Sequence, residues 1–228
     1  MDKVEVKFGE WFGQGFNLYK ENFGVLVLAS LIAWALGAVT LGILLGPMLA
    51  GIYIICLGLI DKKEPKPVVG DLFKGFQYFL NSFLFIFVWG VLFFVVASLL
   101  MLVPCIGQVA TVVLVYVVQA FLMFGLFLIV DKEMDFWPAS MESYHKVKSN
   151  LWLFLAVAVV AGLIGGIGAV ACGIGMVITF PIQACIFTVA YRDVFREGEI
   201  SPQIEESPPA EADTDEKNAD DKNIDTET

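Results

Sequence analysis

One long uncharged stretch constrains the fold of this chain more than any other feature. From Asn150 to Tyr191, about forty consecutive residues contain no Lys, Arg, Asp or Glu, and the stretch closes with Arg192 and Asp193. A helix needs roughly 20 apolar residues to cross a membrane once. The stretch is therefore long enough for two crossings, and its interruption by Gly-Ile-Gly at 173–175 and by Pro181 predicts a transmembrane helical hairpin.

Two earlier stretches have the same character. No charged residue occurs between residues 22 and 60 or between 75 and 130, and Pro47 and Pro104 stand near the expected turns. With 58% hydrophobic residues, the chain far exceeds the roughly 45–50% of soluble domains. We therefore expect an all-α integral membrane helical bundle with six transmembrane helices in three hairpins. The first two spans are near the lower limit of about 17 residues, so a re-entrant first hairpin is an alternative.

A segment rich in aromatic residues precedes each hairpin. Residues 7–21, 71–80 and 136–149 carry Phe, Trp and Tyr among polar residues, often three or four positions apart. Aromatic rings prefer the headgroup level of a bilayer, and amphipathic helices lie along it. These segments are predicted to form interfacial amphipathic helices.

The three hairpins share a pattern of polar residues at their ends. They start after Asn22, Asn81 and Asn150 and end at Asp61, Asp131 and Asp193. This pattern predicts three repeat-like units, 8–61, 70–131 and 136–193. Because each unit would contain two spans, the copies would be parallel around an axis along the membrane normal. Alternatively, any series of hairpins needs polar residues at its ends, and Asn is a good helix cap.

The acidic character of the chain is confined to its end. The formal net charge is −10, but residues 1–196 contain twelve basic and twelve acidic residues, whereas residues 197–228 contain twelve acidic and two basic ones. The last segment also has three prolines and no aromatic residue. We expect residues 1–196 to form the membrane domain and 197–228 a disordered acidic cytoplasmic tail able to dock a protein partner.

The positions of the basic residues predict the orientation. All fourteen Lys and Arg residues lie before the first hairpin, in the loops near 61–74 and 131–149, or after Tyr191. Six spans would place all these regions on one side, and positive loops face the cytoplasm. Both termini should therefore be cytoplasmic, with the lipid bilayer of the cytoplasmic membrane around the bundle. No basic stripe outside these loops favours nucleic-acid binding.

The uncharged stretches carry few groups suited to chemistry. The single His145 has no second histidine with which to hold a metal, and no nucleophile–base pair is evident. We expect no enzyme activity, cofactor or metal. Gln119 and Gln183 lie in the middle of predicted spans, where an amide either forms interhelical hydrogen bonds or lines a polar path through the membrane.

Cysteines and glycines allow two further predictions. Cys105 and Cys172 both fall at predicted outer turns, where an oxidising compartment would allow a disulfide between the second and third hairpins. The alternative is two small buried thiols. Gly162 and Gly166 have the small-xxx-small spacing that lets membrane helices approach closely.

Several motifs of the third unit recur together in one protein group. They are Asp-Phe-Trp-Pro-Ala at 135–139 with Ser143, Val-Lys-Ser-Asn-Leu-Trp at 147–152, Cys-Gly-Ile-Gly at 172–175 with Thr179 and Pro181, and Ala-Tyr-Arg-Asp at 190–193. On these residues the chain resembles bacterial multi-pass membrane proteins that include the membrane domain of glycerophosphoryl diester phosphodiesterases. The resemblance is weaker over the first two units and absent from the tail. It implies the fold and a membrane location but no activity, because the hydrolase of such proteins is a separate soluble domain.

Two functions remain open from the sequence. The first is a non-enzymatic membrane organiser or accessory subunit, favoured by the small-residue interfaces, the interfacial aromatic residues and the acidic tail. The alternative is a passive or facilitated pathway for a small or lipid-like solute among the three hairpins. A pathway needs polar residues from several spans around one axis, whereas an organiser should have a sealed apolar centre. Oligomeric state is left open.

Overall fold

All regular structure in the described part of the chain is helical. The computed structural model describes residues 7–103, 106–170 and 174–204. The prediction of an all-α fold is confirmed for these residues. The helices are, in chain order, α1 (Phe8–Glu21), α2 (Phe23–Val39), α3 (Leu45–Ile60), the 3-10 helix η1 (Val69–Tyr78), α4 (Phe79–Leu100), α5 (Ile106–Leu122), α6 (Gly125–Asp131), α7 (Phe136–Ser149), α8 (Leu151–Val170) and α9 (Ile174–Ile204).

A helix forms at each of the three aromatic segments and leads into an apolar helix. The chain bends by 87° between α1 and α2 and by 109° between α7 and α8. Asn22 and Asn150 are the single residues at these two bends. Each of the predicted units therefore has the same order of elements, one amphipathic helix followed by two apolar segments.

The three asparagines at the starts of the hairpins differ in role. Asn22 closes α1, because its Nδ2 donates to the Leu18 carbonyl oxygen at 2.9 Å, and it makes no side-chain cap for α2. The backbone N–H of Asn150 closes α7 on the Val147 carbonyl. Asn81 instead lies inside α4 and donates to the Asp135 carboxylate at 3.2 Å.

The second apolar segment of unit two is interrupted, which the sequence analysis does not predict. Between α5 and α6, the Ser143 hydroxyl from α7 donates to the Phe121 carbonyl at 2.7 Å and accepts from the Phe124 N–H at 3.2 Å. A side chain that inserts in this way replaces bonds of the helical ladder. Ser143 thus ties the interfacial helix of unit three to the last helices of unit two.

Gly168 and Gly175 let α8 and α9 pack closely. A Cβ built on Gly168 would collide with the backbone of Gly175, whereas one built on Gly166 would meet nothing within 4 Å. Pro181 does not break the hairpin, because α9 continues through it. Of the two glycines expected to lie at helix contacts, Gly162 lies against Tyr116 and Gln119 of α5, whereas Gly166 faces open space.

Several helices are long and apolar enough to cross a membrane. Within the described residues these are 69–100, 106–131 and 175–195, and each bent pair, α1 with α2 and α7 with α8, qualifies when counted as one span. This gives three spans, or up to five. At 1.5 Å per residue, α2 and α3 are about 26 Å and 24 Å long, less than the roughly 30 Å of a bilayer core. The structure thus has several helices that can span a membrane, while the count of six stays a prediction because the helices of the first hairpin are short.

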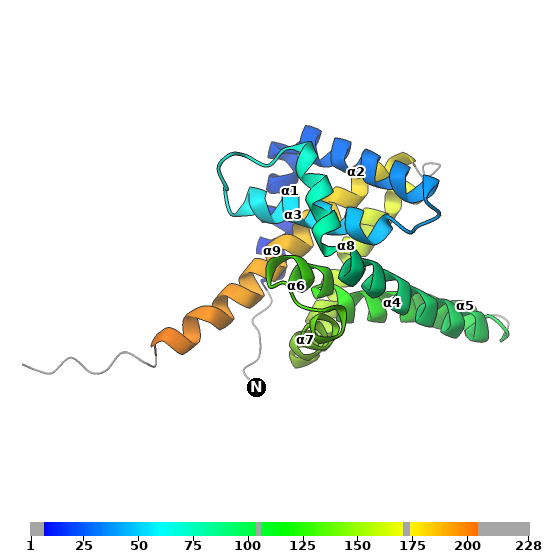
Figure 1. Cartoon of the computed structure of the whole chain (residues 1–228). Coiled ribbons are helices and arrows are strands. Elements are labelled where there is room, and N and C mark those ends of the chain that lie inside the picture. Colours follow the sequence, from blue (N-terminus) through cyan, green and yellow to red (C-terminus); the bar gives the residue numbers. More distant parts are fainter. Residues whose placement is uncertain (1–6, 104–105, 171–173, 205–228) are drawn as a thin grey trace, which may run out of the picture.

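The hairpins extend from a shared centre (Figure 1). The turn between α2 and α3, the last turn of α4 and the first turn of α5 lie at the right of the view, whereas the loop after α3 and the end of α9 lie at the left. α9 packs against α1, α2, α3 and α8. It runs to Ile204, past residue 196, where the membrane domain was expected to end. Residues 205–228 of the predicted tail lie outside the described residues.

Candidate functional site

A cavity of about 410 Å³ lies among the helices of the three units. Its walls come from α3, α4, α5, α6 and α9 and from the segment joining α5 to α6. Most of the lining is hydrophobic, and six aromatic residues contribute to it: Tyr53, Phe85, Trp89, Phe93, Phe180 and Phe187. No Lys, Arg, Asp, Glu or His is among the residues that line it. The cavity is therefore suited to an uncharged, largely apolar molecule.

The two glutamines predicted to lie within the membrane both line this cavity. Gln119 reaches it from α5 and Gln183 from α9. Each amide lies over a glycine of α8, because a Cβ on Gly162 would be 3.0 Å from the Gln119 Oε1 and one on Gly165 would be 3.2 Å from the Gln183 Cδ. The glycines thus leave room for the amides.

Neither glutamine forms the expected interhelical hydrogen bond with another residue that the structure describes. Gln183 is only 8% exposed. An amide in apolar surroundings costs free energy unless it is hydrogen-bonded. The two amides are therefore polar groups that a ligand in the cavity could hydrogen-bond.

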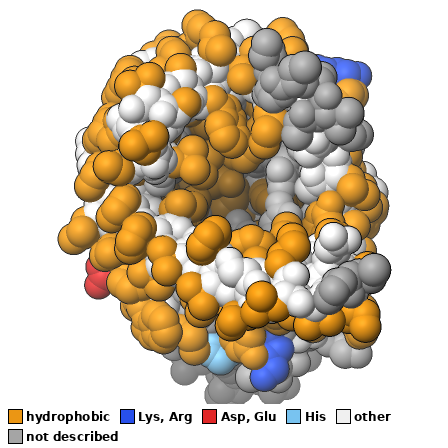
Figure 2. Space-filling model, turned by 90° about the vertical axis from the view of Figure 1, so that its right-hand side faces the viewer, with side chains coloured by type: hydrophobic (Ala, Val, Ile, Leu, Met, Phe, Trp, Pro, Cys, Tyr) orange, Lys and Arg blue, Asp and Glu red, His pale blue; other side chains and the backbone are white. Residues whose placement is uncertain are grey.

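The end of the molecule that carries the hairpin turns is hollow. Figure 2 shows this face, with a hollow at its centre whose walls and floor are mostly hydrophobic. Between the hairpins the chain therefore does not form a sealed apolar centre on this side. An opening with apolar walls allows a molecule with hydrocarbon chains to enter without losing contact with apolar surface.

A cluster of charged and polar side chains joins the three units at their carboxyl ends. Arg192 of α9 binds Asp131 through both Nη1 and Nη2, at 2.8 and 3.0 Å, and its Nη2 also binds Asp61 at 2.5 Å. The Tyr191 hydroxyl donates to Asp131 at 2.9 Å. Two of the three predicted terminal aspartates thus meet one arginine from the third unit, in the bidentate geometry that favours strong pairs.

The third of these aspartates, Asp193, binds residues at the start of the chain. Asp193 accepts a hydrogen bond from the Trp11 Nε1 at 2.7 Å and pairs with Lys7 at 3.5 Å. Trp11 is 1% exposed. These contacts hold α1 against α9. Because each charged side chain here has an oppositely charged partner, we assign this group to stability.

The other predicted residues lie apart from the cavity. Pro47 is in the first turn of α3, where its missing N–H costs no hydrogen bond, and its carbonyl lies against Gly75. His145 on α7 contacts the ring of Tyr144. Pro104, Cys105 and Cys172 fall outside the described residues, so the predicted disulfide is not described. Cys56 of α3 and Cys185 of α9 are buried free thiols.

Compared with known protein families, characterised proteins and solved structures, the chain matches none of them. The resemblance of the third unit to the phosphodiesterase membrane domain therefore stays a prediction. Sequence reasoning had picked out both glutamines and all three aspartates. It missed the aromatic wall of the cavity, because those residues carry no signal that separates a wall from any lipid-facing surface.

Proposed function

We propose that this chain is a six-span protein of the cytoplasmic membrane that binds a lipid-like solute among its hairpins and lets it move passively. The observation that carries the proposal is the cavity of about 410 Å³, with aromatic walls and the unpaired amides of Gln119 and Gln183. Its volume falls in the range of roughly 300–1,000 Å³ typical of ligand sites. The amides would hydrogen-bond an ester or hydroxyl of the solute, and the aromatic walls would contact its hydrocarbon chain.

Passive movement follows from the absence of charge. The three uncharged stretches contain no Asp, Glu, Lys, Arg or His with which to couple transport to protons. The short α2 and α3 complete the six spans if the bilayer thins locally around them, at a modest cost in free energy. The positive loops support an orientation with both termini in the cytoplasm.

The test is to fill the cavity. Gly90 lines it, and a Cβ there would meet nothing within 4 Å, so Gly90→Leu places a larger side chain at the wall of the cavity with room for its first carbon. Gly166→Leu is the matched control, because Gly166 also has open space but does not line the cavity. Both variants and the unaltered chain would be reconstituted in liposomes with a fluorescent phospholipid, and its movement between leaflets would be followed by chemical quenching.

The unaltered chain and Gly166→Leu should accelerate this movement over protein-free liposomes, and Gly90→Leu should abolish most of the acceleration. If the unaltered chain does not exceed protein-free liposomes, or if both variants behave alike, the proposed pathway is wrong.

A specific surface supports the organiser as a second candidate. α4 exposes a row of large apolar side chains, among them Phe87, Phe94 and Leu99 at 55%, 71% and 61% exposed. In a membrane this face contacts either lipid or the helix of a partner protein. A photoreactive amino acid at Phe94, activated in native membranes, should crosslink one defined protein if the chain is an organiser. Crosslinks to lipid alone would leave the solute pathway as the only candidate.

A further inference from the structure

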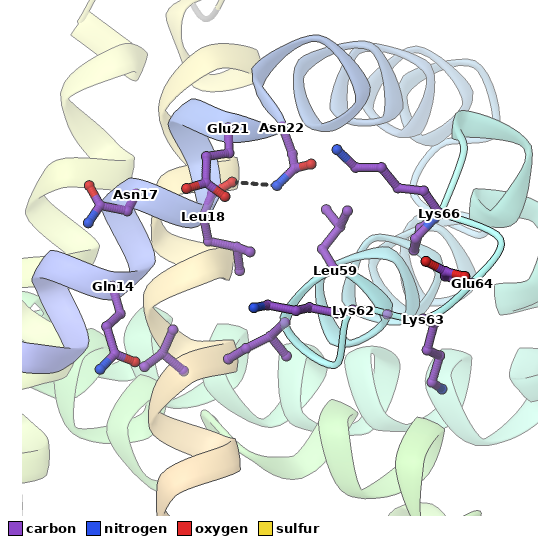
Figure 3. A pocket seen from close by; sticks show the side chains of 14 residues that line it. Gln14, Asn17, Leu18, Glu21, Asn22, Leu59, Lys62, Lys63, Glu64 and Lys66 are labelled. Carbon is purple, nitrogen blue, oxygen red and sulfur yellow. Dashed lines mark hydrogen bonds between the residues drawn. The ribbon is translucent and has the colours of Figure 1, made fainter.

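A second cavity, of about 460 Å³, lies between α1 and the loop that follows α3 (Figure 3). Eight of its fourteen lining residues are polar or charged. Gln14, Asn17 and Asn22 come from α1 and its end, and Lys62 and Lys66 come from the loop. It shares no lining residue with the central cavity. The two pockets are therefore separate sites.

Two lysine side chains give this polar pocket groups that can bind an anion. Lys62, Lys63 and Lys66 line it together with Glu21 and Glu64. Lys62 and Lys66 extend toward α1, whereas Lys63 points away (Figure 3). None of the three lysines forms an ion pair with another described residue. Two unpaired ammonium groups facing one pocket are an arrangement that suits a phosphate.

Asn22 adds a requirement that a bare phosphate does not meet. The residue is 7% exposed, and its Nδ2 donates to the Leu18 carbonyl oxygen at 2.9 Å. This bond fixes the amide orientation and leaves the Oδ1 buried with no hydrogen-bond partner among the described residues. In Figure 3 the Oδ1 faces the side of the pocket where Lys66 lies. A buried acceptor without a partner is costly, so a ligand that supplies an O–H or N–H hydrogen would stabilise it.

The position of the pocket indicates the source of such a ligand. It is bounded by the amphipathic helix α1 and by a lysine-rich loop next to the end of α3. Amphipathic helices lie at headgroup depth, and basic loops next to spans attract lipid phosphates. We infer that this pocket binds the headgroup of a phospholipid, with its phosphate between Lys62 and Lys66 and its hydroxyl or primary ammonium donating to the Asn22 Oδ1.

Thermal unfolding of the purified full chain in neutral detergent tests this inference. Soluble short-chain phosphatidylglycerol, phosphatidylethanolamine and phosphatidylcholine would be titrated separately, and inorganic phosphate would serve as the water-soluble source. Phosphatidylglycerol and phosphatidylethanolamine should raise the unfolding temperature saturably. Phosphatidylcholine has a phosphate but no donor hydrogen, so it should bind about fivefold more weakly, the value of one hydrogen bond. Equal binding of all three lipids would refute the role of Asn22.

Variants test the lysines. Lys62→Gln with Lys66→Gln should weaken binding of phosphatidylglycerol at least about tenfold, because two charge-assisted contacts are lost. Lys20→Gln with Lys148→Gln removes the same charge outside the pocket, from residues whose contacts are with aromatic rings, and should bind as the unaltered chain does. Equal losses in both double variants would mean general charge attraction and would overturn the site. Saturable stabilisation by inorganic phosphate alone, as strong as that by lipid, would overturn the assignment to a lipid headgroup.

Discussion

At the residue scale, the arginine at the end of the third unit is the clearest structural device in the chain. Arg192 is 16% exposed by its side chain, and its partners Asp61 and Asp131 are 13% and 23% exposed. The guanidinium joins units one and two to unit three at a single point. Removing one partner of a mostly buried ion group leaves the others without a counter-charge.

We predict that Arg192→Gln destabilises the fold by about 2–4 kcal/mol, since Asp61 and Asp131 lose the guanidinium that they share. Lys74→Gln is the matched control, because it breaks the exposed pair with Asp71 and should cost less than about 1 kcal/mol. Unfolding by a graded denaturing detergent measures both. Equal stability losses would show that Arg192 does not join the units.

Substituting the two glutamines tests whether they hold helices together or line the cavity for a ligand. Because neither amide hydrogen-bonds with another described residue, Gln119→Leu with Gln183→Leu should leave the unfolding temperature nearly unchanged and lower the affinity for a lipid-like solute about tenfold or more. Lipid titration and thermal unfolding of the same preparation check this. A large loss of stability with unchanged affinity would instead indicate that the glutamines stabilise the contacts between helices.

At the element scale, the sequence predicted where helices form better than it predicted which helix surfaces contact each other. The amphipathic segments and the starts of the apolar helices follow from residue spacing, and helices form at those places. The interruption between α5 and α6 could not be predicted, because it depends on a hydroxyl from α7 about twenty residues away. Likewise, the spacing of Gly162 and Gly166 suggested a contact surface, but the rotation of α8 sets which glycines face α9.

The glycines of α8 provide a matched pair of substitutions. Gly168→Ala should destabilise the α8–α9 hairpin by about 1–3 kcal/mol, because the added methyl collides with the backbone near Gly175. Gly166→Ala meets open space and should be neutral or slightly stabilising, because Ala favours a helix over Gly. Thermal unfolding compares them. A neutral Gly168→Ala would mean that the two helices are not packed this closely.

At the scale of the whole molecule, charge and hydropathy predict which segments lie at the same end, but not how the hairpins spread apart. The terminal aspartates of all three units contact neighbouring units, which the sequence pattern alone did not predict. The cavity depends on how far the α4–α5 hairpin diverges from the others. Sequence reasoning could not find it because lining and lipid-facing residues are equally apolar.

The orientation can be tested in cells that express a variant of the chain in which its four cysteines have been replaced. Ile43, in the turn between α2 and α3, is 53% exposed, and Glu64 is exposed in the loop after α3. We predict that Ile43→Cys reacts with a membrane-impermeant maleimide in intact cells and that Glu64→Cys reacts only after permeabilisation. The reverse pattern would place the termini outside the cytoplasm.

The most direct measurement of the central claim is photochemical mapping of a bound lipid. The purified full chain would be loaded with a phospholipid carrying a diazirine in its acyl chain, irradiated, digested and analysed by mass spectrometry. We predict labelling of Trp89 and Phe180 inside the cavity, lost in Gly90→Leu and kept in Gly166→Leu, while labelling of Phe94 on the outer face of α4 stays constant in all three proteins. Labelling confined to Phe94 and other outward residues, with the same pattern in Gly90→Leu, would contradict a lipid-like solute in the central cavity.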